Sequence, residues 1–549
     1  MRNILIGGAW PYANGSLHIG HLAGLLPGDV LARYHRAVGD NVYFVSGSDC
    51  HGTPVAIRAK KDGKTPGEIS NFYHEEFQEC FEKLGFSYDV YTKTSAPEHK
   101  EFVRNFHEKL YKSKYVYEKE VPQAYCDKCD TYLADRYVEG QCPNCGEDAR
   151  GDQCDACGTV LEPENLLEPV CAICGKSISF RNSKHLYIAV SELENQLKEL
   201  VGGHPEWRKN AIAFTHRYIS EGLRDRALTR GLDWGIPVPK EGYEGKTIYI
   251  WAENVLGYLS ASKVAADIRQ NDFEALWGEK SKHYYVHGKD NIPFHSIILP
   301  ALLIANNTKW HLPDQIVSSE YLTLEGRKIS TSQNYAIWAK ELLQCYEPDS
   351  VRYYFLAHGP EKKDADFSWK EFVYSHNGEL LGAYGNFINR SLSFINKYWN
   401  GIIPSGEDNA EITEKIEELY VTIGRLIEKA AFKDAINEIF DFIRYANKFF
   451  DTEQPWITRD TNERVCKNTL YQCVQIIANL AVLLQPFLPF SSEKVCKWLN
   501  INSKWERKYV PAGHQLPEIE ILFRRIDKKV IETETEKLKA ILANGLKQS

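Results

Sequence analysis

The sequence predicts an α/β protein in which a doubly wound parallel sheet is interrupted by a cysteine-rich insertion and followed by an all-α domain. Three observations support this prediction. Strand and helix patterns alternate over residues 2–46, eight cysteines form Cys-x-x-Cys pairs within 126–174, and long helical periodicity begins at about residue 370. With 549 residues, 43% of them hydrophobic, the chain is long enough for several domains with separate cores.

The composition narrows the class of protein. No run of about 18 consecutive apolar residues is present, and the first residues lead directly into a strand pattern without a cleavage site. We therefore expect a soluble, cytoplasmic protein with no membrane partner. The formal net charge of −8 argues against indiscriminate coating of nucleic acid, and no DNA partner is expected. Any nucleic-acid contact has to use local basic patches and specific shape.

The first part of the chain predicts one βαβ unit. Residues 2–9 form a buried parallel strand, a loop covers 10–16, a helix runs from about 17 to 38, and a second strand covers 41–46. In a doubly wound sheet the ligand lies beyond the carboxyl ends of the strands. The loop at 10–16 and the segment 48–52 are therefore expected beside the site.

Metal ligation is the better interpretation of the paired cysteines, because the chain is long and lacks a signal peptide. Disulfides and free core thiols are the alternatives. The pairs predict two structural zinc (Zn²⁺) sites, each tetrahedral with four cysteine ligands. The short glycine-containing link from Cys145 to Cys154 favours a nested arrangement, with the middle pairs on one ion and the outer pairs on another. The pairs are Cys126 with Cys129, Cys142 with Cys145, Cys154 with Cys157, and Cys171 with Cys174.

Two other segments have the features of a phosphate site. His18 and His21 lie at the start of the predicted helix, where free N–H groups and the positive dipole end favour anions. Gly20 between them would let an adenine ring approach the backbone closely. Residues 325–332 form a glycine-led basic loop that can close over phosphates. Taken alone, such histidines are more often surface or satisfied core residues, and such a loop is more often a solvated turn.

Together these two segments resemble the HIGH and KMSKS signatures of class I aminoacyl-tRNA synthetases. The resemblance implies a Rossmann-type catalytic domain that uses ATP with Mg²⁺, and a helical anticodon-binding domain. It implies catalytic roles for His18, His21 and Lys328, and ATP binding by His18, Gly20, His21, Asp290, Lys328 and Thr331. Thr331 stands where the family usually has a second lysine, so Arg327 and Lys328 would carry the phosphate contact. A catalytically impaired paralogue therefore stays open.

The segments 9–16, 48–54 and 288–295 resemble the methionyl members of that family, which implies methionine and tRNA(Met) as substrates. By this resemblance, methionine is bound by Ala9, Trp10, Tyr12, Asp49, Trp251, Tyr258 and His295. Asp49 would pair with the ammonium group, and the aromatic rings suit a polarisable thioether. Core packing is the alternative for each aromatic. Trp10 stands where the best-known bacterial forms have a smaller apolar residue, and the residues between Trp251 and Tyr258 also differ from those forms.

The helical part contains candidate RNA-binding residues. Asn386 and Arg390 lie four residues apart on one helix face, and Trp456 offers a ring on which a base can stack. The resemblance implies that all three bind the anticodon, while a helix-surface or core position is the alternative for each. The chain leaves no room for the C-terminal dimerising domain of some relatives, so a monomer is expected.

The expected domains are a first catalytic half (1–118), the insertion (119–240), a second catalytic half (241–370) and the helical domain with its tail (371–549). Two other functions stay open. One is a class I paralogue that activates another thiol- or thioether-bearing amino acid, and the other is a non-catalytic, zinc-dependent RNA-binding protein.

Overall fold

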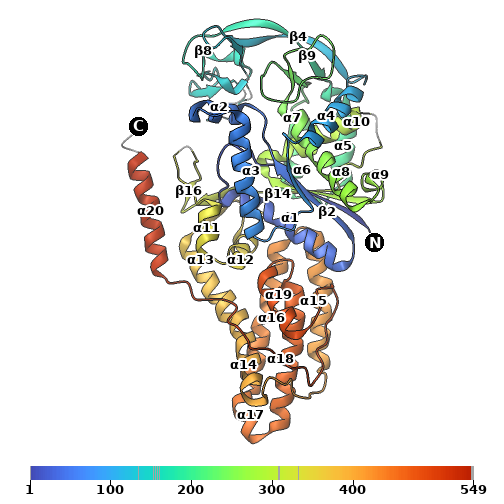
Figure 1. Ribbon diagram of the computed structural model, residues 1–549, viewed down its shortest axis with the longest axis vertical. Coiled ribbons are helices and arrows are strands. Elements are labelled where there is room, and N and C mark those ends of the chain that lie inside the picture. The colour runs from blue at the N-terminus through green and yellow to red at the C-terminus, as the bar shows by residue number, and fades with distance from the viewer. Residues whose placement is uncertain are drawn as a thin grey trace.

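The computed structural model describes residues 2–133, 135–151, 154, 156, 157, 159, 161–306, 309–331 and 333–545. Ser332, the last residue of the predicted phosphate loop, lies outside them. The molecule is elongated, with the parallel sheet near its middle, the cysteine-rich insertion at one end and the helical domain at the other (Figure 1). Within the described residues, no helix is both long and apolar enough to cross a membrane.

The central sheet has five strands in the order β14-β13-β1-β2-β3. They are β1 (Asn3–Gly8), β2 (Asn41–Ser48), β3 (Val90–Lys93), β13 (Ser281–Gly288) and β14 (Gln315–Ser319). All neighbouring strands are parallel. The predicted doubly wound α/β class is therefore confirmed. The strand order reverses at β1, and ligands of such sheets bind in the crevice beyond the carboxyl ends at that point.

Helix α1 (Ile19–Val38) packs against this sheet and begins later than the predicted start at about residue 17. The reason is that His18 takes the N-cap position, with an extended backbone and a side chain that accepts a hydrogen bond from the N–H of Gly20. The helix ends at Gly39, whose φ of 97° is the left-handed conformation that glycine adopts easily.

The other elements of the catalytic half surround the sheet. They are α2 (Thr53–Asp62), α3 (Pro66–Lys83), α4 (Pro97–Leu110), α7 (Ile250–Glu253), η4 (Asn254–Leu256), α8 (Gly257–Arg269), α9 (Phe273–Leu276), η5 (Lys289–Asn291), η6 (Phe294–Ile298), α10 (Leu299–Ala305), β15 (Leu322–Leu324), β16 (Arg327–Lys328), α11 (Ala339–Cys345), α12 (Pro348–His358) and β17 (Ala365–Phe367). Strand β16 pairs antiparallel with β15, so the predicted basic loop is a hairpin. Its turn residues, Glu325 and Gly326, both have positive φ, as a tight two-residue hairpin turn requires.

The insertion has its own antiparallel sheets. One has the order β10-β9-β4-β5 and another has the order β7-β6-β8. The elements are β4 (Val116–Cys126), β5 (Thr131–Tyr132), η1 (Asp135–Tyr137), β6 (Val138–Gln141), β7 (Asp148–Arg150), η2 (Pro163–Asn165), β8 (Leu167–Cys171), β9 (Ser179–Ile188), η3 (Val190–Leu193), α5 (Glu194–Gly203), α6 (Lys209–Ser220), β10 (Arg226–Ala227), β11 (Thr229–Arg230) and β12 (Thr247–Ile248).

The helical domain begins near the predicted change of periodicity. Its helices are α13 (Trp369–Ser375), η7 (His376–Gly385), α14 (Asn386–Trp399), α15 (Ala410–Glu428), α16 (Phe432–Glu453), α17 (Pro455–Thr461), α18 (Glu463–Leu484), α19 (Pro489–Leu499) and α20 (Lys529–Gly545). Residues 473–484 lie in α18, and every one of them is buried. This helix is the centre of the domain.

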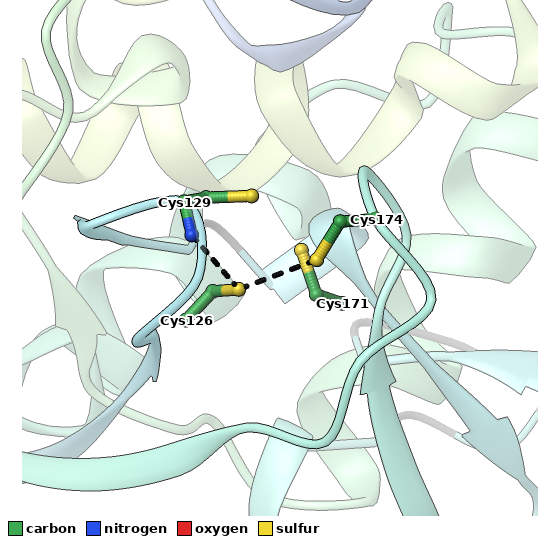
Figure 2. A group of neighbouring side chains, drawn as sticks. All are labelled: Cys126, Cys129, Cys171 and Cys174. Carbon is green, nitrogen blue, oxygen red and sulfur yellow. Dashed lines mark hydrogen bonds between the residues drawn. The ribbon is translucent and has the colours of Figure 1, made fainter.

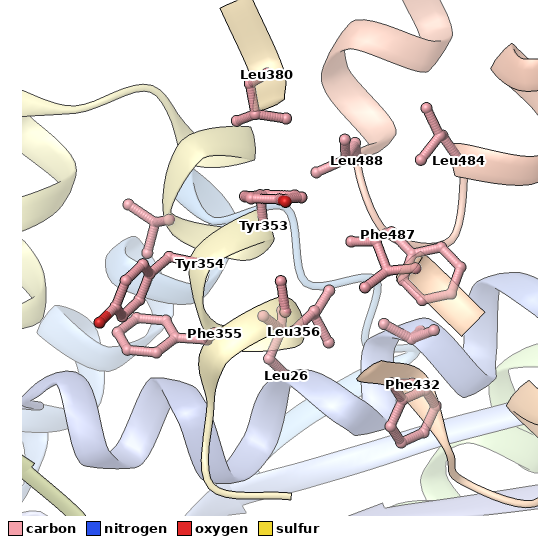
Figure 3. Packing of buried hydrophobic residues seen from close by; sticks show 14 of the residues in the cluster. Leu26, Tyr353, Tyr354, Phe355, Leu356, Leu380, Phe432, Leu484, Phe487 and Leu488 are labelled. Carbon is pink, nitrogen blue, oxygen red and sulfur yellow. The ribbon is translucent and has the colours of Figure 1, made fainter. Parts of the chain in front are cut away.

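A buried ion pair lies at the junction between the sheet and the helical domain. Arg352 of α12 lies 2.7 Å from the carboxylate of Asp29 in α1, and both side chains are fully buried. Arg352 also donates to the carbonyl oxygens of Leu84, Pro486 and Phe487. Apolar side chains from α1, α12 and the helical domain, among them Leu26, Leu356 and Leu488, belong to one core cluster (Figure 3).

Asp29 makes this junction sensitive to pH. Burial alone would raise the pKa of Asp29, but the charges of Arg33 and Arg352 outweigh it and lower the pKa to about 2. The unfolded chain has the ordinary value of about 3.9. The stabilisation is therefore fully present above about pH 4 and is lost as the pH falls towards 2.

We expect Asp29→Asn to cost about 3–5 kcal/mol near pH 7, because it leaves Arg352 buried without its counter-charge. The measurement is the midpoint of urea unfolding, and the difference from the parent should shrink below about pH 4. The double variant Asp29→Leu with Arg352→Met is the control, since an apolar pair should recover most of the loss. An unchanged midpoint in Asp29→Asn would contradict the role of the ion pair.

Candidate functional site

The two histidines at the start of α1 form a reciprocal cap. Nδ1 of His18 accepts from the backbone N–H of Gly20, and Nδ1 of His21 accepts from the backbone N–H of His18, both at 3.1 Å. The ring centroids lie 4.0 Å apart. Because both Nδ1 atoms accept, each neutral ring carries its proton on Nε2. Both Nε2–H groups therefore remain as donors beyond the capping contacts.

Both imidazoles are neutral near pH 7. Burial, together with the neighbouring His21, lowers the pKa of His18 to about 2, and burial lowers the pKa of His21 to about 4. Gly20 is required for this arrangement, because a Cβ at that position would lie 2.9 Å from the His18 ring. Gly20 thus leaves room for the His18 ring in the cap. The sequence also suggests a second role for this glycine, which is to let a ligand approach the backbone closely.

The basic hairpin lies next to this cap. The N–H of Ile19 donates to the carbonyl of Ile337 at 3.1 Å, and the N–H of Ala339 donates to the carbonyl of Leu17 at 2.8 Å. The side chain of Ile329 lies 3.9 Å from the position that a Cβ of Gly20 would take. Lys328, its neighbour on β16, is exposed, as are Arg327 and Thr331. The sheet and hairpin thus bring the predicted phosphate residues to one region.

Asp290 lies at the carboxyl end of β13, in the turn η5. Its carboxylate accepts a hydrogen bond from the hydroxyl of Tyr321. Neighbouring Lys289 pairs with Glu320 at 2.8 Å and with Asp364 at 2.7 Å. Asp290 is exposed and lies next to Lys289, whose charge is neutralised by these two carboxylates. Both residues are at the edge of the sheet where ligands of this fold bind.

Asp49 follows β2 and is completely buried. The loop after β1 is fastened to it, since the N–H of Ala13 donates to the Asp49 carbonyl at 2.8 Å and the N–H of Asp49 donates to the Pro11 carbonyl at 2.9 Å. Ala9 is held in turn by β13, because its N–H donates to the carbonyl of Val286. Burial and the charge of Glu253 raise the pKa of Asp49 well above its usual range. A cationic ligand would relieve that penalty.

Tyr258 and His295 form a buried hydrogen-bonded pair. Nδ1 of His295 donates to the carbonyl of Asn291 at 2.8 Å, so its Nε2 accepts from the hydroxyl of Tyr258 at 2.8 Å. Tyr258 and Trp10 are buried, Trp251 is half-buried and Tyr12 is 40% exposed. Burial lowers the pKa of His295 to about 4, so this polar pair is uncharged at pH 7.

The eight cysteines of the insertion form two groups of four, and the sulfur atoms of each group lie within 4.8 Å of one another. Cys126, Cys129, Cys171 and Cys174 form one group, and Cys142, Cys145, Cys154 and Cys157 form the other. In the first group two turns bring the side chains together (Figure 2). This is the nested grouping that the spacing favoured.

The predicted anticodon residues lie at the far end of the helical domain. Arg390 of α14 lies over the ring of Phe450 at 4.5 Å and over that of Trp456 at 5.8 Å, and it pairs with Asp451 at 2.6 Å. Asn386 is the first residue of α14. The Trp456 ring is 42% exposed, so one face can still receive a base. Helices α14 and α17 are well separated from the sheet (Figure 1).

Two family models match the chain. Residues 4–392 match the model of tRNA synthetases class I (M), and residues 403–542 match the model of the anticodon-binding domain of methionyl tRNA ligase. The chain belongs to the class I tRNA synthetases of the methionyl type. The histidine cap and the basic hairpin both lie within the residues that match the first model.

Individual relatives agree with this assignment. A methionine–tRNA ligase of Bacillus cereus is 53% identical over 540 residues, which cover 98% of this chain and 99% of the relative. Methionine–tRNA ligase 2 of Bacillus anthracis has the same identity and coverage. The solved methionyl-tRNA synthetase of Mycobacterium tuberculosis, in complex with methionyl-adenylate, is similar in fold, with a TM-score of 0.80 and 22% identity over 96% of this chain and 100% of that one.

Sequence reasoning missed several residues of this synthetase site. Glu253 is fully buried, accepts a hydrogen bond from Nδ1 of His51 and lies 3.8 Å from His99. Gly47 and Gly257 flank the Trp10 ring, because a Cβ at either would lie within 2.6 Å of it. The Gly-Ser-Asp order at the end of β2 is a signal that could have identified Gly47. Glu253 has no comparable signal.

Proposed function

We propose that this chain is a methionine–tRNA ligase, which activates methionine with ATP and transfers it to tRNA(Met). One observation supports the proposal. Two neutral, capped imidazoles lie beside a basic hairpin at the switch point of the sheet. The buried carboxylate of Asp49, which has no cationic partner among the described residues, lies in the same region. Amino-acid activation requires hydrogen-bond donors for the phosphate groups of ATP and a site for the ammonium group of the amino acid.

In the first step the methionine carboxylate attacks the α-phosphate of ATP, and the bond to pyrophosphate breaks to give methionyl-adenylate. His18 and His21 donate their Nε2–H groups to phosphate oxygens as negative charge grows on the leaving pyrophosphate. Lys328, with Arg327 beside it, adds positive charge from the hairpin. Mg²⁺ bound with ATP neutralises part of the triphosphate charge. No side chain acts as a nucleophile.

The amino-acid pocket selects for a cationic group at one end and a thioether at the other. Asp49 receives the ammonium group, and Ala9 and Trp10 line the approach from β1. Tyr12, Trp251 and Tyr258 surround the side chain, where aromatic contacts with sulfur are favourable. Nε2 of His295 accepts a hydrogen bond from the hydroxyl of Tyr258, and both groups are neutral. The pocket therefore presents no charge to the thioether.

In the second step a hydroxyl of the terminal ribose of tRNA attacks the adenylate carbonyl and releases AMP. Asn386, Arg390 and Trp456 would recognise the anticodon at the other end of the molecule, with Trp456 stacking on an unpaired base. The ion pair between Arg390 and Asp451 fixes the guanidinium plane beside the indole ring. Base recognition would therefore use a side chain already in place.

The test of this function is amino-acid-dependent exchange of pyrophosphate into ATP over a panel of amino acids, followed by charging of tRNA with a CAU anticodon. We expect methionine alone to support rapid exchange. In the same assay His21→Ala should lower the exchange rate at least roughly tenfold with the KM for methionine little changed, because its contact tightens as pyrophosphate leaves. An unimpaired rate would remove His21 from catalysis, and exchange with another amino acid would change the assigned substrate.

Each cysteine group fits one structural zinc ion, since four thiolates in close contact are the usual donor set of a closed tetrahedral site. Metal analysis of protein purified without chelator should find two zinc ions per chain. Cys157→Ser, in the more exposed group, should reduce this to one. Cys345→Ser is the control, because this exposed cysteine lies outside both groups and should leave the content unchanged. One ion or none in the parent protein would refute the two-site proposal.

Trp456→Ala should lower tRNA charging roughly 10- to 100-fold, which corresponds to the loss of one base–aromatic stack. Pyrophosphate exchange should be unaffected, because it does not involve tRNA and α17 lies far from the sheet (Figure 1). Both rates are measured on the same preparation. A parallel fall in the two activities would mean that the ring is needed for folding and not for tRNA.

A further inference from the structure

A hydrogen-bonded pair at the amino-acid pocket has two buried oxygens that lack partners. Nδ2 of Asn254 donates to Oδ2 of Asp49 at 3.0 Å. The other oxygen of each side chain, Oδ1 of Asp49 and Oδ1 of Asn254, is buried and has no hydrogen-bond partner within the described part of the chain. Leaving such acceptors unpaired costs free energy, so they point to a ligand with several donors.

The orientation of the Asn254 amide follows from its partner. The amide turns its NH₂ group towards Asp49, because Nδ2 of Asn254 is the donor and a carboxylate oxygen is the acceptor. The amide oxygen is then left free, directly beside the group that contacts the carboxylate. The two unpaired oxygens therefore belong to one rigid unit with two neighbouring acceptors.

The charges around this unit also indicate a cationic ligand. Burial and the charge of Glu253 raise the pKa of Asp49, whereas hydrogen bonds from Asn254, the His51 backbone and Thr94 lower it. Among the described residues, no lysine or arginine pairs with Asp49 or Glu253. Two buried carboxylates therefore share a region without a permanent cation, which a positively charged ligand would stabilise.

The position of Asn254 in the fold places it among the substrate residues. It opens η4, the short turn between α7, which carries Trp251, and α8, which carries Tyr258. Both aromatics belong to the proposed methionine pocket. The turn thus brings the amide to Asp49 from the same segment that lines the side-chain end of the pocket.

We infer that Asn254 is a second binding group for the α-ammonium of the amino-acid substrate, acting together with Asp49. The inference rests on the proposed function. An ammonium group has three N–H donors, and the two free oxygens accept two of them. The hydrogen bond between the two side chains holds both acceptors in place before the substrate arrives, which reduces the entropy cost of binding.

The test compares two probes that differ only in the ammonium group: the sulfamoyl analogue of methionyl-adenylate and its counterpart without the amino group. Binding to the full-length parent, Asn254→Leu and Asn254→Ala is measured by calorimetry. We expect either substitution to weaken the amino-bearing probe roughly 10- to 100-fold, the loss of a hydrogen bond to a charged group, and to change the other probe less than about threefold. Asn254→Ala adds no bulk, so it keeps the test valid if the leucine variant folds poorly.

Asn306→Leu is the matched control, because it removes another buried amide of the catalytic half, one that donates to the carbonyl of Phe106. It should leave the affinity for both probes unchanged. Equal losses for both probes in the Asn254 variants, or no loss for the amino-bearing probe, would overturn the inference. Failure of the proposed function is distinguishable, since the parent would then show no methionine-dependent pyrophosphate exchange.

Discussion

The catalytic half and the helical domain depend on one buried charge contact. Asp29, in the middle of α1, binds Arg352 of α12, and neither side chain reaches water. Separating them would leave an unpaired buried charge. Arg352 also donates to the carbonyl oxygens of Pro486 and Phe487, so the same side chain connects the ion pair to the helical domain. The amino end of the same helix carries the two imidazoles. Helix α1 therefore carries both a residue of the junction and the two imidazoles of the proposed catalytic centre.

In the proposed mechanism, the histidine cap contributes to catalysis through orientation and not through charge. Both rings are neutral at pH 7, and their Nδ1 atoms are engaged by the backbone. A permanent cation there would bind ATP and the transition state with similar strength, which lowers KM without raising kcat. Fixed N–H donors act most strongly where charge develops. The permanent charges, Arg327 and Lys328, lie instead on the exposed hairpin.

The features that the sequence predicted depend on residues close together in the chain. The spacing of His18 and His21, the Cys-x-x-Cys pairs and the alternation of strand and helix are all local patterns, and the fold class and the nested cysteine groups followed from them. The start of α1 was wrong by two residues because a histidine, which is an unusual N-cap, ends the loop. Asn254 and Glu253 were missed because their partners, Asp49 and His51, lie 205 and 202 residues away. No periodicity in the chain connects such positions.

Trp10 illustrates the same limit and also explains how the pocket accommodates a large side chain. Its indole lies against Gly47 at the end of β2 and against Gly257 at the start of α8. A Cβ at Gly47 would approach the ring to 2.4 Å, and one at Gly257 would approach it to 2.5 Å. Tryptophan at this position therefore requires glycine at both others. The three positions come from three separate segments, so the wall of the proposed amino-acid pocket is a joint property of the loop after β1, of β2 and of α8. A change at any one of them has to be compensated at the others for the pocket to keep its shape.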